Sequence, residues 1–397
     1  MTEKNILILA TTNEFLGKFE QQNVRILRQK GFTVHYAANM NEPSYLHDIE
    51  RIKKMGVQAH HIEIARSPYM FQYNTKAFRQ LLHLIRKYRI DAIHCHTPVG
   101  GLLGRLAGWL PKKERPIILY TAHGFHFYKG APLFNHLFYY PVERFLAHNT
   151  DILIVINEED YRNAKRFRLK KGGSLYKIPG EGLDLDVFHP VSDEEKREKR
   201  KNLGILDEDF FLLSVGEINA NKNQKIVVEA LSILKKRKGA QSIRYGIVGD
   251  GFFREKLQDF VEKKGMEKEV IFYGYCSNPW DYIGCADAVI FPSKREGLGM
   301  AGLEALAMGV PLLASDNRGT REYMEHGKNG FLFQYNNVKE VAKTIENIRN
   351  LDEKTKREMR QECVLSVKPF ENVYAGAVMQ RIYTEMERRM ERRNGKK

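Results

Sequence analysis

The stretch from Phe291 to Ser315, FPSKREGLGMAGLEALAMGVPLLAS, constrains the fold more than any other part of the chain. Its pattern is typical of the end of a buried strand, a loop, a short helix and the next buried strand. Pro292 stops the first strand, Ala288–Phe291, and Gly309 with Pro311 ends the helix in the way helices usually stop. The stretch therefore predicts one strand–loop–helix–strand unit.

The chemistry predicted for this unit is an anion site with a carboxylate on either side. The backbone N–H groups of Gly299, Met300 and Ala301 lie at the expected helix start, where unsatisfied donors and the helix dipole attract phosphate. A carboxylate beside a phosphate would repel it, so Glu296 and Glu304 suit the hydroxyl groups of sugars better. The alternative is an ordinary unit that carries two solvated surface acids.

The pattern E-x7-E within EGLGMAGLEALAMGVPLLAS resembles the family-4 (group 1) retaining glycosyltransferases of the GT-B fold. The resemblance implies an α/β chain with two Rossmann-like, doubly wound parallel-sheet domains that face each other across a cleft. It assigns Glu304 to the ribose of a nucleotide-sugar and Glu296 to the transferred sugar. It also implies transfer without a metal ion, and no cofactor beyond the nucleotide-sugar substrate.

Apolar runs alternate with amphipathic segments in the first half of the chain, which indicates a parallel sheet with crossover helices. A loop is expected from Thr11 to Lys18, after the first strand. The expected strands are Asn5–Ala10, Thr33–Ala37, Ala92–His96, Ile117–Thr121 and Ile152–Ile156.

A domain change is expected near SLYKIPGEGLDLDVFHP, which resembles the family's connector. The expected division is an acceptor-side domain over residues 1–185 and a nucleotide-sugar-binding domain over 186–370. A last helix over 371–397 is expected to cross back to the first domain, as the resemblance implies.

Other donor-binding residues follow from the same resemblance. Lys222 matches the family's phosphate-binding lysine, a point charge suited to a diphosphate. Gly249 and Asp250 lie in a GDG turn after a strand, and Tyr275 stands where the family contacts the nucleobase. Glu217 occupies the place of a family arginine, so another basic residue or the helix start must neutralise more of the phosphate charge.

Two histidine pairs follow expected strands: His94 with His96, and His123 with His126. His-x-His spacing is compatible with zinc, but no carboxylate or cysteine cluster with ligand spacing accompanies it, so no metal site is predicted. Packed or hydrogen-bonded histidines are the alternative, above all for His94. The resemblance assigns His123 to the reacting sugar as a catalytic residue, and it leaves His126 without a role.

The net charge of +15 predicts an acidic partner, which could be nucleic acid, an anionic membrane or phosphorylated small molecules. Aromatic residues in APLFNHLFYYPVERFLAHNT and basic residues in YRNAKRFRLKKGG and Tyr69–Arg89 suit an anionic membrane surface. A core-facing helix with a solvated charged face is the alternative. The sequence has no motif of a nucleic-acid-binding protein, and its four cysteines show no disulfide spacing, which favours the cytosol.

The resemblance thus implies a glycosyltransferase, which we expect to be cytoplasmic and peripheral to the membrane. It would move a sugar from a nucleotide-diphosphate donor, a UDP-sugar, to a lipid-linked or saccharide acceptor in surface polysaccharide synthesis. Two alternatives stay open: an epimerase or hydrolase of nucleotide-sugars with the same fold, and a basic nucleic-acid-binding protein.

Overall fold

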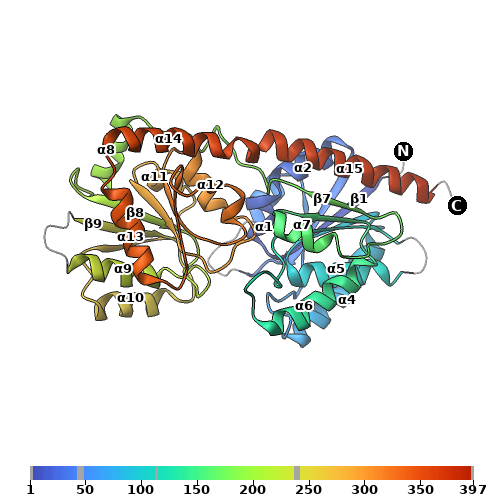
Figure 1. Ribbon diagram of the computed structural model, residues 1–397. Helices are drawn as coiled ribbons and strands as arrows, with labels where there is room; N and C mark the ends of the chain where they lie inside the picture. Colours follow the sequence, from blue (N-terminus) through green and yellow to red (C-terminus); the bar gives the residue numbers. More distant parts are fainter. Residues whose placement is uncertain (1–2, 43–48, 112–114, 237–241, 395–397) are drawn as a thin grey trace. The chain divides into compact units, whose positions relative to one another are not determined.

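The computed structural model describes residues 3–42, 49–111, 115–236 and 242–394. The chain divides into two compact units, each with its own parallel sheet (Figure 1). The N-terminal unit comprises Met1–Gly182 and, from the other end of the chain, Asn372–Lys397. The second unit comprises Leu183–Glu371.

The sheet of the N-terminal unit has seven described strands, and every neighbouring pair is parallel. The strand order reverses direction between β1 and β4, so this is a doubly wound sheet. From edge to edge the strands are β3 (Gln58–His61), β2 (Phe32–Asn39), β1 (Lys4–Thr12), β4 (Ala92–Cys95), β5 (Ile117–Ala122), β6 (Ile152–Val155) and β7 (Ser174–Lys177).

Helices cover both faces of this sheet, as crossover connections require. Contrary to the expected loop from Thr11 to Lys18, a short helix begins at Glu14, because Phe15 and Leu16 turn inward and are buried. The helices are α1 (Glu14–Phe19), α2 (Gln21–Gln29), α3 (Ile49–Lys54), α4 (Phe71–Lys87), α5 (Pro98–Trp109), α6 (Leu133–Ala147), α7 (Glu158–Ala164) and α15 (Asn372–Asn394).

Helix α15 belongs to the N-terminal unit although it ends the chain (red beside blue α2 in Figure 1). Buried residues recur along one of its faces at helical spacing. Glu387 forms ion pairs with Lys4 and Lys30 at 2.9 and 2.8 Å. The helix thus completes the layer over the sheet. Its buried face comprises Ala375, Met379, Ile382, Tyr383, Met386 and Met390.

The second unit repeats the architecture with six described strands, again all parallel. The strand order is β10 (Val270–Gly274), β9 (Ile243–Val248), β8 (Phe210–Val215), β11 (Ala288–Phe291), β12 (Leu312–Ser315) and β13 (Gly330–Phe333). Its helices are α8 (Asp193–Asn202), α9 (Lys225–Lys235), α10 (Arg254–Lys263), α11 (Trp280–Ile283), α12 (Met300–Ala307), α13 (Val338–Arg349) and α14 (Glu353–Val367), with 3₁₀ turns at Thr320–Glu322 and Lys368–Phe370.

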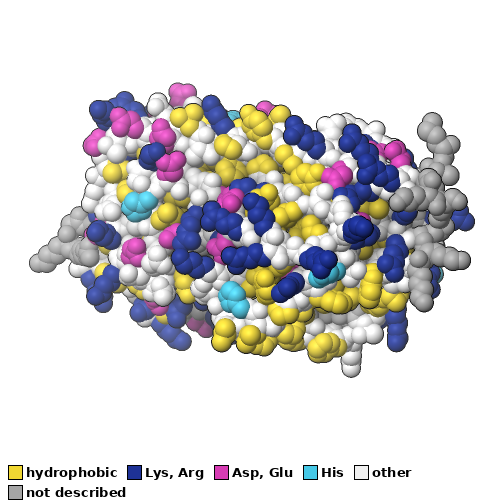
Figure 2. Space-filling model, turned by 45° about the vertical axis from the view of Figure 1, so that its right-hand side comes forward, with side chains coloured by type: hydrophobic (Ala, Val, Ile, Leu, Met, Phe, Trp, Pro, Cys, Tyr) yellow, Lys and Arg dark blue, Asp and Glu magenta, His cyan; other side chains and the backbone are white. Residues whose placement is uncertain are grey.

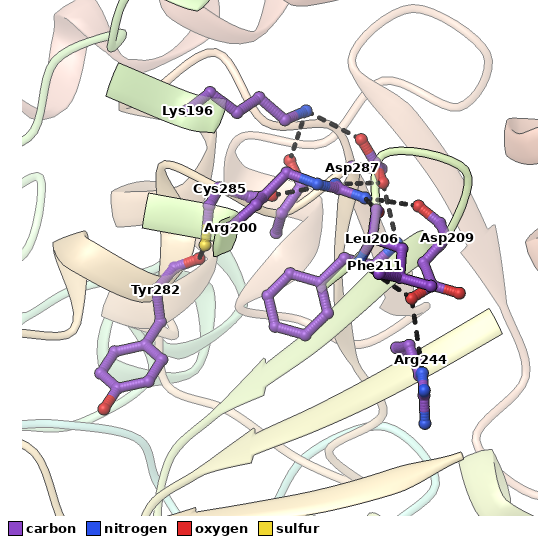
Figure 3. A network of polar contacts seen from close by, with 10 residues as sticks. Lys196, Arg200, Leu206, Asp209, Phe211, Arg244, Tyr282, Cys285 and Asp287 are labelled. Atoms are coloured by element: carbon purple, nitrogen blue, oxygen red, sulfur yellow. Dashed lines mark hydrogen bonds and ion pairs between the residues drawn. The ribbon is translucent and has the colours of Figure 1, made fainter. Parts of the chain in front are cut away.

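A polar network fixes α8 to the amino-terminal edge of this second sheet (Figure 3). Asp287, just before β11, accepts a hydrogen bond from the Phe211 N–H at 2.8 Å and pairs with Lys196 and Arg200 at 2.8 and 3.0 Å. Arg200 also donates to the carbonyl of Asp209 at 2.6 Å. Because its charge is paired and bonded, the buried guanidinium is compatible with the core here. The network lies at the edge opposite the carboxyl ends of the strands, so we assign it a structural role.

The predicted fold class is therefore confirmed: two Rossmann-like sheets with interleaved helices. In the part of the chain that the structure describes, no helix has the length and apolar character needed to cross a bilayer.

Candidate active site

The carboxyl ends of β8 and β11 meet at the point where the strand order of the second sheet reverses, which is where open α/β sheets bind ligands. Lys222 lies in the loop after β8, and Glu296 lies in the loop after β11. The Lys222 Nζ is 2.8 Å from the Glu296 Oε1. Asn221 joins the two loops, since its side chain donates to the Arg295 carbonyl at 3.0 Å and its own carbonyl accepts from the Lys294 N–H at 2.8 Å.

Local contacts set the direction of the Lys222 side chain. The Asn219 side-chain oxygen accepts the N–H groups of Asn221 and Lys222, both at 2.9 Å, and so closes a tight turn. The Lys222 Nζ lies 4.6 Å from the centre of the Phe291 ring, within cation–π distance. The ammonium group is thus held at the carboxyl edge of the sheet while 23% of the side chain stays exposed.

Gly299 is the N-cap residue of α12 at this edge of the sheet, and its φ of +92° suits glycine. A Cβ at this position would lie 2.7 Å from the Phe291 ring, so a larger residue would also collide. The Tyr323 hydroxyl donates to the Gly299 carbonyl at 3.1 Å. No side chain caps the helix, which leaves its start, with Met300 and Ala301, able to receive an anion.

The carboxylates of Glu296 and Glu304 both affect the pKa of Tyr323. Burial raises the pKa of Tyr323 well above its usual value, and the charges of Glu296 and Glu304 raise it further. The two carboxylates therefore lie within electrostatic reach of one hydroxyl group at the start of α12. This arrangement brings Lys222, Glu296, Gly299 and Glu304 into one site.

The GDG turn lies beside this site. Gly216 and Gly249 end β8 and β9, and a Cβ on Gly249 would lie 2.0 Å from the Gly216 carbonyl oxygen. Asp250 forms an ion pair with Arg254 at 2.7 Å. Tyr275 follows β10, one strand farther out, and is 40% exposed.

His123 belongs to the N-terminal unit and lies at the carboxyl end of β5. Its Nδ1 is 2.7 Å from the Glu181 Oε1, and its Nε2 is 3.0 Å from the His96 Nδ1. The His96 Nδ1 is also 3.5 Å from the Glu20 Oε1. Both ring nitrogens of His123 thus have partners within their own unit.

The pKa shifts of His123 and Glu181 each favour the charged form of the group. Burial alone would lower the pKa of His123, but the hydrogen bond and charge of Glu181 and the charge of Glu20 raise it. Burial likewise opposes the ionisation of Glu181, but His123 lowers its pKa. Burial raises the pKa of Glu20 to about 7 and, with the charges of His94 and His123, lowers that of His96 well below its usual value.

The two other histidines have structural contacts. His94 is buried and lies within hydrogen-bond distance of the Tyr383 hydroxyl at 3.0 Å and of the Thr121 hydroxyl at 2.8 Å. The ring of His126 stacks on that of Tyr139 in α6, with centroids 4.5 Å apart. His94 is therefore the hydrogen-bonded core residue that its place in a strand indicates.

Glu20, His96 and His123 are the one grouping among the described residues whose His, Cys, Asp or Glu ligand atoms lie close enough to hold a metal ion, within 4.8 Å of one another. His96 and His123 are within hydrogen-bond distance at 3.0 Å, and Glu20 is a carboxylate beside the histidines that the sequence did not predict.

Sequence reasoning missed several neighbours of these residues. Tyr323 and Arg318 follow β12, and Glu20 and Glu181 lie beside the histidines. Glu181 lies in the segment that resembles the family's connector, and Glu20 follows a segment expected to be a loop. Each of these contacts joins residues far apart in the chain, and spacing within a motif does not report such contacts.

Comparison with known proteins gives two family matches. Residues 195–363 match the model described as "Glycosyl transferases group 1", and residues 5–157 match "Glycosyl transferase 4-like". A Bacillus subtilis (strain 168) protein named "Putative glycosyltransferase EpsD" is 41% identical over 345 residues, which are 87% of each chain.

A more distant relative is the Escherichia coli UDP-Gal:alpha-D-GlcNAc-diphosphoundecaprenol alpha-1,3-galactosyltransferase, which is 27% identical over 72% of this chain and 73% of its own. Among solved structures, Anabaena HepE in complex with UDP and glucose aligns with a TM-score of 0.77. That alignment covers 96% of this chain and 100% of HepE at 17% identity, so it bears on the fold alone.

Proposed function

Because the chain belongs to the group 1 glycosyltransferases, we propose that it transfers a sugar from a UDP-sugar to a lipid-linked or saccharide acceptor in surface polysaccharide synthesis. The observation that carries this proposal is Lys222, held 2.8 Å from Glu296 at the uncapped start of α12. The named activity of the E. coli relative, which transfers galactose from UDP-Gal to a diphosphoundecaprenol-linked sugar, supports the donor and acceptor classes.

In the proposed reaction the bond between the sugar C1 and the diphosphate breaks while an acceptor oxygen bonds to C1 on the same face. The acceptor proton passes to the departing phosphate. Lys222 and the N–H groups at Gly299–Ala301 stabilise the charge that develops on the diphosphate. Glu304 accepts hydrogen bonds from the ribose, and Glu296 from the sugar.

The GDG turn and Tyr275 complete the proposed donor site, with Gly249 allowing close approach of the backbone and Tyr275 beside the nucleobase. Asp250 acts through its ion pair with Arg254, which orients the turn. For His123 we retain the catalytic assignment that the resemblance implied. Its Nδ1 stays bonded to Glu181, and its Nε2 exchanges the contact with His96 for an oxygen of the substrate.

A panel of nucleotide-sugars in a thermal-shift assay, followed by incubation of the stabilising donor with acceptor in EDTA, tests this proposal. We expect a UDP-sugar to raise the melting temperature and transfer to proceed in EDTA. Epimerised or hydrolysed donor as the main product would favour the alternative enzyme class. A rate lost in EDTA and restored by Zn²⁺ would contradict metal independence and implicate Glu20, His96 and His123.

We also propose that the N-terminal unit docks on an anionic membrane through what we call the α6 surface. Exposed apolar side chains from α6 and from the start of α4 form this surface, and Tyr69 lies 6.4 Å from Phe138 across it, centroid to centroid. Figure 2 shows hydrophobic side chains gathered along the lower margin of the molecule with Lys and Arg among them. The apolar residues are Tyr69, Met70, Phe71, Tyr73, Leu133, Phe134, Leu137, Phe138 and Phe145.

The charges around the α6 surface match an anionic partner. Helix α4 has no acidic residue and carries four exposed basic ones, of which Lys76 pairs with Glu63 at 3.0 Å. The one acid of α6, Glu143, is neutralised by the buried Arg105 at 2.8 Å. Apolar side chains at the acyl boundary with cations near the headgroups are the pattern of an interfacial helix. The basic residues of α4 are Lys76, Arg79, Arg86 and Lys87.

Replacing both Leu133 and Leu137 with glutamate is expected to weaken binding to phosphatidylglycerol vesicles by at least about tenfold, since each buried leucine contributes roughly 1.5–3 kcal/mol. Leu133 and Leu137 are 73% and 69% exposed, so folding should be preserved. Vesicle sedimentation measures the effect, with Leu365→Glu, at a 49% exposed site of the second unit, as the control. Equal sedimentation of both variants would refute the α6 surface, and tighter binding to duplex DNA than to vesicles would revive the nucleic-acid alternative.

A further inference from the structure

Three side chains that suit zinc meet at the carboxyl edge of the sheet in the N-terminal unit. His96 directly follows β4, His123 directly follows β5, and these two strands are neighbours. Glu20 is the N-cap residue of α2. Two imidazoles and a carboxylate form a ligand set that zinc takes in proteins, with a fourth position left to water. No metal site was expected from the sequence for want of an accompanying carboxylate, and Glu20 supplies one.

The distances between the ligand atoms suit a single zinc ion. The His96 Nδ1 is 3.0 Å from the His123 Nε2 and 3.5 Å from the Glu20 Oε1. Ligand atoms that lie about 2.0–2.1 Å from a tetrahedral zinc ion are about 3.3 Å apart, so both distances are close to that spacing. All three ligand atoms lie within 4.8 Å of one another. Small movements of these side chains would therefore complete the site.

Hydrogen bonds to the other atoms of these side chains orient the ligand atoms. The His123 Nδ1 is 2.7 Å from the Glu181 Oε1, which leaves the His123 Nε2 to face His96. The Asn23 side chain donates to the Glu20 Oε2 at 2.8 Å, which leaves the Glu20 Oε1 on the side of His96. A carboxylate at the second nitrogen of a ligand histidine is a usual outer partner in zinc sites.

The surroundings of His96 indicate that its Nδ1 is the ligand atom. His96 is fully buried, and its Nε2 has no hydrogen-bond partner among the described residues. His94 packs against it with ring centroids 4.1 Å apart, but both nitrogens of His94 lie within hydrogen-bond distance of hydroxyl groups. The side chain of His123 is 21% exposed, against 0% for His96 and 2% for Glu20. An ion would thus enter from the side of His123.

We propose that Glu20, His96 and His123 bind one zinc ion and that the bound ion inhibits sugar transfer. Zinc takes the place of the hydrogen between the His96 Nδ1 and the His123 Nε2, and the proton passes to solvent. The inhibition rests on the proposed function, in which the His123 Nε2 contacts an oxygen of the substrate. A nitrogen bound to zinc cannot make that contact. The zinc site itself rests only on the geometry of the N-terminal unit.

Calorimetric titration of the full, EDTA-stripped and dialysed chain with Zn²⁺ tests the site. The variants are Glu20→Gln and His96→Gln, and the control is His136→Gln, which replaces an exposed histidine of α6 in the same unit. We expect the unaltered chain and the control to bind one zinc ion, and the first two variants to lose at least about tenfold in affinity. Excess Mg²⁺ should not compete, because it prefers oxygen ligands. Urea unfolding checks that each variant is folded.

Transfer rates measured against increasing Zn²⁺ test the inhibition. The unaltered chain should lose activity at zinc concentrations near its dissociation constant, and EDTA should restore the activity. Glu20→Gln, which keeps the shape of the side chain, should need at least about tenfold more zinc for the same fractional loss.

The outcomes separate the zinc site from the proposed function. No zinc binding by the unaltered chain, or equal affinity in Glu20→Gln, His96→Gln and His136→Gln, would overturn the site. A transfer rate that zinc leaves unchanged or raises would overturn the inhibition. If zinc binds as expected but no sugar is transferred even in EDTA, the proposed function fails and the zinc site stands.

Discussion

Replacing Glu296 with glutamine is expected to lower sugar transfer at least about 100-fold, the usual scale for losing one group that acts on the transition state. UDP affinity should stay the same or increase. The reason is the 2.8 Å ion pair between Lys222 and Glu296, which the diphosphate must displace. Glutamine removes the competing charge and frees Lys222 for phosphate. Steady-state transfer rates and calorimetric UDP affinity measure the two effects.

Glu304→Gln is the matched control because it makes the same carboxylate-to-amide change within α12, whereas Glu296 lies in the loop before that helix. It should weaken UDP binding, since Glu304 is assigned to the ribose, whereas Glu296→Gln should not. If Glu296→Gln loses UDP affinity to the same extent as Glu304→Gln, then Glu296 does not compete for Lys222. The separate roles of the two carboxylates would then be wrong.

The second large effect is expected from Ile382→Asp in α15. Ile382 is fully buried, so the variant places an uncompensated carboxylate in the core and should reduce the free energy of unfolding by about 3–5 kcal/mol. Urea unfolding followed by circular dichroism measures this loss. The control is Gln380→Asp, at an exposed position of the same helix.

The outcome of that comparison tests the place of α15 in the fold. A large loss in Ile382→Asp with little change in Gln380→Asp is expected if α15 completes the N-terminal unit. Equal stability of the two variants would mean that α15 does not dock on this unit in solution.

Long apolar strands could be predicted from the sequence, whereas the edge strands of the first sheet could not. The buried strand β1 has an unbroken apolar run at its centre, which is typical of a parallel sheet covered on both faces. The edge strands β3, QAHH, and β7, SLYK, are short and partly exposed, so they have little apolar pattern to detect. The short helix α1 was expected as loop because its buried pair, Phe15 and Leu16, is too brief to show helical periodicity.

The candidate site, like the fold, could be predicted only in part from the sequence. Glycines and glutamates within one strand–helix unit have a recognisable spacing, so Glu296, Gly299 and Glu304 could be named from the sequence. The pairing of Lys222 with Glu296 crosses 74 residues, and that of His123 with Glu181 crosses 58. Such contacts depend on which strands are neighbours in the sheet, and no local pattern encodes that order.

Transfer from a UDP-sugar to a polyprenyl-diphosphate-linked sugar, with the new linkage determined by NMR, tests the central claim most directly. The account predicts transfer with the donor's anomeric configuration retained, and its loss in Glu296→Gln at undiminished UDP affinity. Transfer with inversion, or full activity of Glu296→Gln, would contradict it.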